Sequence, residues 1–274
     1  YLKSNSAFID IDGVPVHYII EGKADDTLPI VLIHGTSASL HTWDTLSSLL
    51  KANKKIIRFD LPAFGLTGPN RLNQYNFNFY NQFLDEFLSK LNVTQCIVAG
   101  NSLGGSIAWN YAIASPDKVK QLILLDASGY PKKDEKGSLG FKLAAVPVLN
   151  QALKHISPIS LIRKSLEDAF YNKAFVTEKM VQQYHDMLLR EGNRAAVLEL
   201  FQHPMKADAT KIKKINQPTL IIWGKEDQLI SYTNASLFKQ DIQDSRVLVL
   251  DKVGHIPMEE APNQVATAIL EFIK

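Results

Sequence analysis

The chain has 274 residues, of which 46% are hydrophobic, so it can bury a large core and lies near the upper size of one undivided domain. Its 30 lysines and arginines nearly balance 28 aspartates and glutamates, and a formal charge of +2 gives nucleic acid no strong field to bind. The single cysteine, Cys96, excludes an internal disulfide, and no run approaches the roughly 18 apolar residues of a membrane span.

The beginning of the chain predicts an antiparallel hairpin. Residues 7–11 and 14–20 are rich in β-forming residues and flank Asp12-Gly13, a pair suited to a tight turn. After this hairpin the pattern changes to short apolar runs, which alternate with segments whose apolar residues have helical spacing. The expected strands are 30–33, 55–59, 96–99, 122–125, 220–223 and 247–250, and the expected helices are 42–51, 77–91, 103–114, 232–240 and 263–273.

Apolar runs of this kind are typical of parallel strands that are buried on both faces. The alternation therefore predicts an α/β fold with a mostly parallel central sheet, right-handed crossovers and helices on both faces. Between residues 130 and 207 the strand pattern stops, and helical segments at 159–170 and 179–189 dominate. We therefore expect a core of residues 1–129 and 208–274 with an inserted helical cap, or lid, at 130–207. The charged run at 132–136 fits a solvated loop at the start of this cap.

The strongest local signal is the segment Gly100-Asn101-Ser102-Leu103-Gly104, which lies between an expected strand and an expected helix. A nucleophile on a sharp strand-to-helix turn needs small neighbours, because the backbone is strained and two chain segments approach closely. By itself such a motif also fits a glycine-rich turn with an exposed serine. Its position between strand and helix favours Ser102 as a catalytic nucleophile.

A serine nucleophile requires a base and a third group that orients the base. His255 follows the last expected strand, and Asp227 follows the strand before it, so both belong at the carboxyl edge of the sheet. The order Ser102, Asp227, His255 is that of an α/β-hydrolase triad. Asp126 ends another expected strand and is the competing candidate for the acid. Glu226 adjoins Asp227 but points away if Asp227 points inward.

Backbone N–H groups would stabilise the oxyanion in such a site. Leu103 opens the expected helix after Ser102, so its N–H is one natural donor. The segment His34-Gly35-Thr36 follows a buried strand and can face Ser102, so we expect Thr36 to supply the second donor. His34 then shapes this loop, Asp60 holds the turn at 61–65, and the remaining histidines have surface or packing roles.

The sequence contains no cysteine or histidine pair at metal-ligand spacing, no carboxylate cluster and no phosphate-binding loop. We expect neither a metal nor a cofactor. Cys96 lies in a β-rich run and is expected to be a small buried apolar residue.

Together these motifs, with Asp60-Leu61-Pro62, Gly65 and Trp223-Gly224, resemble the α/β-hydrolase superfamily over nearly the whole chain. The elbow and the helical cap are most similar to bacterial lipases and carboxylesterases of the Moraxella type, and the chain also resembles the meta-cleavage-product C–C hydrolases. The resemblance implies Ser102, Asp227 and His255 as the triad, and Thr36 and Leu103 as the oxyanion hole. Ala63 departs from the glycine that relatives commonly have there. Serine at the elbow argues against the dehalogenases and epoxide hydrolases, which have aspartate.

The implied function is hydrolysis of small to medium acyl esters through an acyl-enzyme. Some apolar residues of the expected cap could line an acyl pocket, and others of the same set must form the core of the cap. They are Leu139, Phe141, Leu143, Val146, Val148, Leu149, Phe170, Phe175 and Leu198. One alternative is C–C hydrolysis of meta-cleavage products, for which Arg163, Arg190 and Arg194 could bind substrate carboxylates, although positions on helix surfaces fit these arginines better. Another is a non-catalytic ligand-binding protein of the same fold.

The expected partner is a small-molecule ester, with no nucleic acid and no membrane span in a soluble domain. The first residue, Tyr1, fits an exported or membrane-anchored protein after processing as well as a cytoplasmic one. The sequence therefore predicts no particular compartment, and it predicts no oligomeric state.

Overall fold

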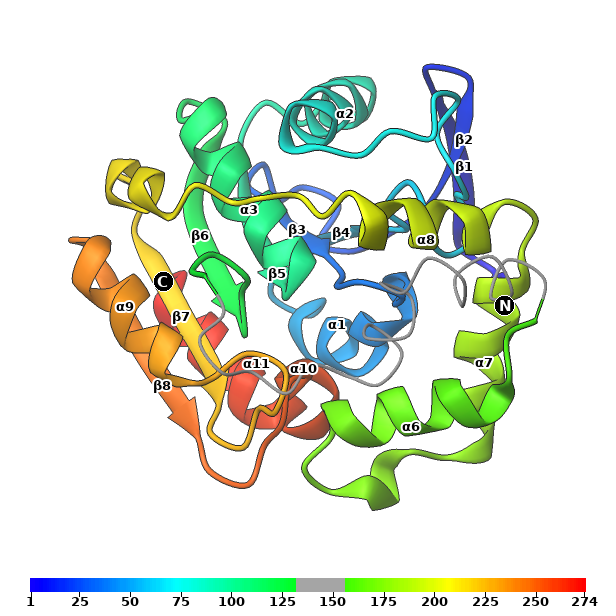
Figure 1. The fold of residues 1–274 in the computed structure, drawn as a ribbon. Coiled ribbons are helices and arrows are strands. Elements are labelled where there is room, and N and C mark those ends of the chain that lie inside the picture. The colour runs from blue at the N-terminus through cyan, green and yellow to red at the C-terminus, as the bar shows by residue number, and fades with distance from the viewer. Residues whose placement is uncertain (132–155) are drawn as a thin grey trace.

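A computed structural model describes residues 1–131 and 156–274, and its strands form one eight-stranded sheet (Figure 1). The strand order is β1-β2-β4-β3-β5-β6-β7-β8. The strands are β1 Ser6–Ile11, β2 Val14–Gly22, β3 Ile30–Ile33, β4 Lys55–Phe59, β5 Cys96–Asn101, β6 Val119–Leu125, β7 Thr219–Gly224 and β8 Ser245–Leu250. β1 and β2 form an antiparallel hairpin, β2 pairs antiparallel with β4, and β3 to β8 run parallel. The predicted fold class is confirmed.

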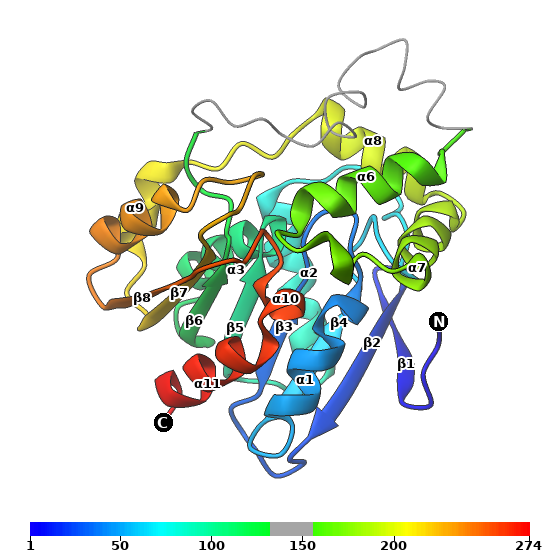
Figure 2. The ribbon, with the colours of Figure 1, turned by 90° about the horizontal axis from the view of Figure 1, so that it is seen from below.

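Helices cover both faces of this sheet. The core helices are α1 Asp44–Leu50, α2 Phe77–Lys90, α3 Leu103–Ala114, α9 Thr233–Asp241, α10 Pro257–Glu260 and α11 Pro262–Phe272, and short 3-10 turns are η1 Leu40–Trp43, η2 Lys173–Phe175 and η3 Ala209–Lys214. Figure 2 shows α1 and α11 together on one face, with α2 and α3 on the other. α2 begins where the Asn76 side chain accepts the Phe79 N–H, and its apolar stripe, with Phe83 and Phe87, packs on the sheet.

Strand β8 differs from expectation. Its sequence predicts burial on both faces, but Val247 and Val249 are each 39% exposed. β8 is the last strand of the sheet and pairs with β7 alone, so part of its surface has no neighbour. An apolar run therefore did not distinguish a central strand from an edge strand.

Three further helices, α6 Ile159–Ala169, α7 Glu178–Leu189 and α8 Asn193–Gln202, lie together at one end of the sheet (Figures 1 and 2). All three fall within the expected cap of residues 130–207. The charged run at 132–136 and the apolar residues from Leu139 to Leu149 lie outside the described residues. None of the described helices is long and apolar enough to cross a membrane.

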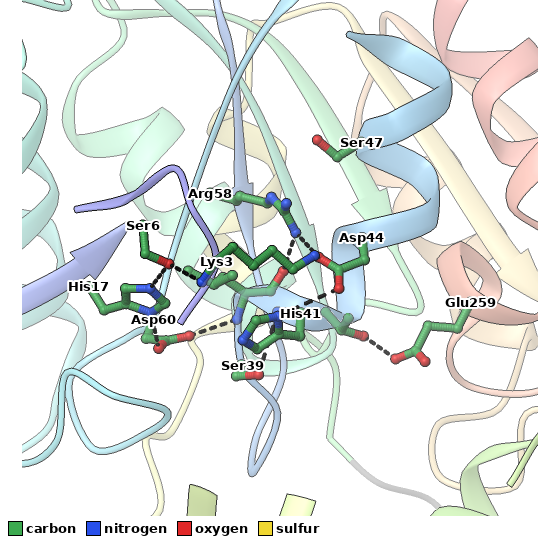
Figure 3. A network of polar contacts seen from close by, with 12 residues as sticks. Lys3, Ser6, His17, Ser39, His41, Asp44, Ser47, Arg58, Asp60 and Glu259 are labelled. Atoms are coloured by element: carbon green, nitrogen blue, oxygen red, sulfur yellow. Dashed lines mark hydrogen bonds and ion pairs between the residues drawn. The ribbon is translucent and has the colours of Figure 1, made fainter. Parts of the chain in front are cut away.

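A polar network fixes the loop that follows β3 (Figure 3). Nδ1 of His17 lies 2.8 Å from Oδ2 of Asp60, and Oδ1 of Asp60 accepts the Leu40 N–H at 2.7 Å. Arg58 contacts Asp44 and donates to the Leu40 carbonyl. Burial would raise the pKa of Asp60, but the His17 hydrogen bond, the neighbouring His34 and the Leu40 N–H hold it below its ordinary value. Asp60 therefore ties the N-terminal hairpin to the segment that enters α1.

Candidate active site

Ser102 lies at the sharp turn between β5 and α3, and its backbone is strained. Its φ is +54° and its ψ is −116°, values that a residue with a side chain rarely adopts. Such a conformation costs about 1–3 kcal/mol and persists only where surrounding contacts impose it. The Ser102 N–H donates to the Leu125 carbonyl at 3.1 Å, and the Ser128 N–H donates to the Ser102 carbonyl at 3.1 Å. These bonds to the end of β6 and the loop beyond it hold the turn.

Glycines permit this turn because other backbone segments lie against it. A Cβ on Gly104 would come within 2.2 Å of the Ile33 carbonyl oxygen, and one on Gly100 within 2.2 Å of the Gly104 carbonyl oxygen. No side chain fits at such distances. A Cβ on Gly35 would lie 3.2 Å from Cβ of Ser102, so the loop after β3 approaches the serine closely.

His255 and Asp227 are brought together as the sequence predicts. Nδ1 of His255 lies 2.7 Å from Oδ2 of Asp227, and both side chains are buried. Oδ1 of Asp227 accepts the N–H groups of Leu229 at 2.7 Å and Ile230 at 3.0 Å. The carboxylate is therefore fixed by its own loop and directs one oxygen to the imidazole.

Two residues that the sequence analysis did not select hold the His255 loop in place. Nδ2 of Asn101 donates to the His255 carbonyl at 3.0 Å, which joins the serine turn to the histidine loop. Glu260 accepts the N–H groups of Gly254 at 2.7 Å and Asn172 at 2.6 Å. The His255 N–H donates to the Ala169 carbonyl at the end of α6, at 2.7 Å. The segment after α6 is thus bonded directly to the histidine loop.

A cavity of about 500 Å³ has both Ser102 and His255 in its wall. Thr36 and Leu103 line the same cavity, and Leu103 is the first residue of α3, where a backbone N–H has no partner within the helix. The described apolar lining residues are mainly Leu161, Ile162, Leu166, Leu188, Val197, Leu198, Phe201, Met205, Leu229 and Ile230. The cavity therefore combines one polar corner at the serine with largely apolar walls from α6 and α8.

Some residues expected in the cavity lie elsewhere. Leu198 lines it, but Phe170 and Phe175 do not, because their rings stack on each other with centroids 6.1 Å apart. Of the three arginines, Arg194 is in the cavity wall. Arg163 contacts Glu178 outside it, and Arg190 is not in the wall. Phe170 and Phe175 are therefore among the residues of that set that pack elsewhere than in the cavity wall.

A second serine, histidine and aspartate set shows why contacts alone do not define a site. Oγ of Ser6 lies 2.8 Å from Nε2 of His17, whose Nδ1 bonds Asp60. Ser6 lies in β1, on regular extended backbone, and is not in the cavity wall. His17 and Asp60 are fully buried in the network of Figure 3, which is consistent with the structural role expected for them. His34 likewise accepts the Leu61 N–H at 2.9 Å and shapes its loop.

Glu259 links the cavity wall to the core. It accepts hydrogen bonds from the hydroxyl of Thr42, drawn in Figure 3, and from the hydroxyl of Tyr184 in α7, at 3.3 Å. Burial raises the pKa of Glu259 from 4.5 to about 7, and the two hydroxyl donors oppose that shift. Between pH 4.5 and about pH 7 the folded state therefore binds more protons at Glu259 than the unfolded state does. The contribution of Glu259 to the free energy of unfolding falls as the pH rises through this range.

Replacing Glu259 with glutamine should remove this pH dependence. We expect the decrease in the free energy of unfolding between pH 4.5 and pH 8 to be smaller by about 2 kcal/mol, a value discounted for the partial exposure of the side chain. Urea unfolding at a series of pH values measures it. Glu271→Gln, the same change at an exposed site on α11, is the matched control. If the free energy of unfolding had the same pH dependence in wild type and in Glu259→Gln, the raised pKa of Glu259 would be contradicted.

This fold, with a strained serine turn beside a histidine and carboxylate pair, defines a class of hydrolases. The chain belongs to the alpha/beta hydrolase fold family, whose model matches residues 29–262. The family resemblance predicted from the motifs is confirmed, and the protein is a hydrolase of this family.

Individual relatives agree with this assignment. The chain is 27% identical over 266 residues to the uncharacterized hydrolase YugF of Bacillus subtilis (strain 168), with 96% of each chain covered. It is 28% identical over 250 residues to Lipase 3 of Moraxella sp. (strain TA144), covering 89% of this chain and 76% of the lipase. The solved meta-cleavage product hydrolase of Pseudomonas fluorescens IP01 matches with a TM-score of 0.84 at 22% identity, covering 98% of this chain and 96% of that one.

Proposed function

We propose that the protein is a carboxylic ester hydrolase in which Ser102 is the nucleophile, His255 the general base and Asp227 the group that orients the base. One observation carries this proposal: the strained Ser102 faces the same cavity as His255, whose Nδ1 lies 2.7 Å from Asp227. Nδ1 bonded to a carboxylate carries the ring proton, so Nε2 is left as the proton acceptor.

The proposed reaction is acyl transfer in two halves. Nε2 of His255 takes the Ser102 hydroxyl proton as Oγ attacks the ester carbonyl, and the resulting oxyanion accepts the backbone N–H groups of Leu103 and Thr36. The imidazolium then protonates the leaving alkoxide, which departs and leaves an acyl-enzyme. Water, deprotonated by His255, hydrolyses the acyl-enzyme and restores the serine.

The substrate class follows from the cavity. Its described walls are mostly apolar and come from α6, the end of α7, α8 and the loop after β7, and a volume of about 500 Å³ suits a small to medium acyl group. In this proposal residues 130–207 form a cap that supplies most of this surface. Burial of each CH₂ contributes about 0.8 kcal/mol, so the acyl chain provides binding energy until the cavity is filled.

The C–C hydrolase alternative requires cations for the carboxylates of its substrate. Among the described residues of the cavity wall, Arg194 is the basic side chain with a permanent charge. The apolar character of the remaining wall favours a neutral ester over a charged dienoate.

A panel of p-nitrophenyl esters from acetate to palmitate tests the proposal. We expect kcat/KM to rise by up to about fourfold per methylene over the short chains, to reach a plateau when the cavity is full, and to be abolished by the serine reagent PMSF. A 2-hydroxy-6-oxo-dienoate serves as the comparison substrate. Turnover of the dienoate without ester hydrolysis would replace the proposal with C–C hydrolysis, and tight binding with negligible turnover would indicate a ligand-binding protein.

A further inference from the structure

Asp126, the carboxylate at the end of β6, is next to the proposed catalytic acid. It is fully buried, and one oxygen each of Asp126 and Asp227 and one ring nitrogen of His255 lie within 4.8 Å of one another. Oδ1 of Asp126 accepts the Gly224 N–H at 2.9 Å. Its Oδ2 is buried and has no hydrogen-bond partner among the described residues, and an oxygen of the Asp227 carboxylate lies within 4.8 Å of an Asp126 oxygen.

Two buried carboxylates whose oxygens lie within 4.8 Å of each other cannot both be ionised at low cost, because like charges repel strongly where water is excluded. A single proton between them satisfies both groups, since a carboxylic acid donates to the neighbouring carboxylate. The contacts decide which group holds it. Asp227 accepts N–H groups from Leu229, Ile230 and His255, and such donors stabilise an anion. Asp126 accepts the Gly224 N–H alone among the described donors, so it is the better site for the proton.

The same contacts argue against a metal ion in this cluster. Three N–H groups already point at the two oxygens of Asp227, and an ion on those oxygens would face their protons. A shared proton leaves all three hydrogen bonds in place.

We propose that Asp126 is a neutral carboxylic acid that donates a hydrogen bond to Asp227 and so positions that carboxylate against His255 without adding a second negative charge. Asp126 is then a positioning residue, and this role rests on the proposed function of Asp227. Burial and the Asp227 charge raise the pKa of Asp126 well above its ordinary value, in agreement with the contacts.

Asparagine is the sharpest substitution at this position. Its carbonyl can accept the Gly224 N–H and its amide can donate to Asp227, so it reproduces a protonated aspartic acid. Asp126 has a φ of +45°, which asparagine tolerates better than most residues. We expect Asp126→Asn to keep kcat/KM within about threefold of wild type on p-nitrophenyl butyrate, with an unchanged pH–rate profile. If Asp126 acted as an anion, the same change would cost about a hundredfold or more.

An infrared measurement tests the proton directly and needs no turnover. The wild-type minus Asp126→Asn difference spectrum at pH 7.5 should contain the carbonyl band of a protonated carboxylic acid. A difference spectrum with only the bands of an ionised carboxylate would overturn the proposal, as would a large loss of activity in a folded Asp126→Asn variant. Ester turnover by wild type and its loss in Ser102→Ala report separately on the proposed function. Failure of those controls would therefore be distinguishable from failure of the Asp126 assignment.

Discussion

Replacing Ser102 with alanine is expected to lower kcat on p-nitrophenyl butyrate by roughly 10⁶-fold, because loss of a serine nucleophile removes the covalent pathway entirely. The residual rate would come from substrate binding and the oxyanion donors. The backbone at position 102 has a positive φ, which alanine would also have to adopt, so we expect the turn to keep its strained shape. A rearranged turn is therefore not expected to restore activity in the variant. Steady-state turnover with purified variant, together with loss of labelling by PMSF, measures the effect.

The matched control is Ser6→Ala. The Ser6 hydroxyl bonds His17, and His17 in turn bonds Asp60, but Ser6 lies in β1 outside the cavity wall. We expect this variant to keep kcat within about twofold of wild type. Ester turnover that survives Ser102→Ala, or is lost in a folded Ser6→Ala, would show that the wrong serine has been chosen.

The order of strands and helices could be predicted because the buried runs are short and apolar. Segments whose apolar residues have helical spacing separate these runs. Ile30–Ile33 and Leu103–Ala114 have in the structure the bounds that the pattern predicts. The same pattern does not indicate whether a strand is central or at an edge of the sheet. β8 shows this, since Val247 and Val249 read as buried residues although their strand is at an edge.

The candidate site residues could be selected because the carboxyl ends of parallel strands meet at one edge, which brings Asp227 and His255 together from separate loops. The supporting contacts could not. Asn101 stands beside Ser102 in the motif, but its bond to the His255 carbonyl crosses between two loops far apart in the chain. Glu260 bonds backbone N–H groups, which leave no trace in the side chains of their residues. Such contacts depend on the packed fold and not on local pattern.

Ala63 departs from the expected family motif, and the backbone conformation shows what this departure changes. The residue has a φ of +90° and is fully buried, in the turn where the family resemblance leads us to expect glycine. The Ala63 N–H donates to the Gly68 carbonyl at 2.7 Å, and this bond closes the turn. The turn therefore retains its shape with alanine at the cost of strain, at a position outside the proposed triad.

Replacing Asp227 with asparagine should lower kcat by about 10⁴-fold while the protein stays folded. The side-chain oxygen of asparagine can still accept the N–H groups of Leu229 and Ile230, so its amide nitrogen must face His255. Nδ1 would then have to accept that hydrogen bond, which moves the ring proton to Nε2 and leaves no base for Ser102. Turnover of p-nitrophenyl butyrate and a thermal unfolding scan separate loss of catalysis from loss of structure.

Two variants make this result specific to Asp227. Glu226→Gln alters the adjacent carboxylate, which accepts the Val253 N–H and not the imidazole, and should cost only a few-fold in kcat. Asp126→Asn makes the identical chemical change within the same buried cluster and should leave kcat nearly unchanged. If Asp126→Asn were instead the inactive variant and Asp227→Asn the active one, the acid of the triad would be Asp126. We expect Asp227→Asn to be the inactive variant, because more N–H groups surround the Asp227 carboxyl than the Asp126 carboxyl. The ionised group is the one that the backbone and the imidazole already stabilise.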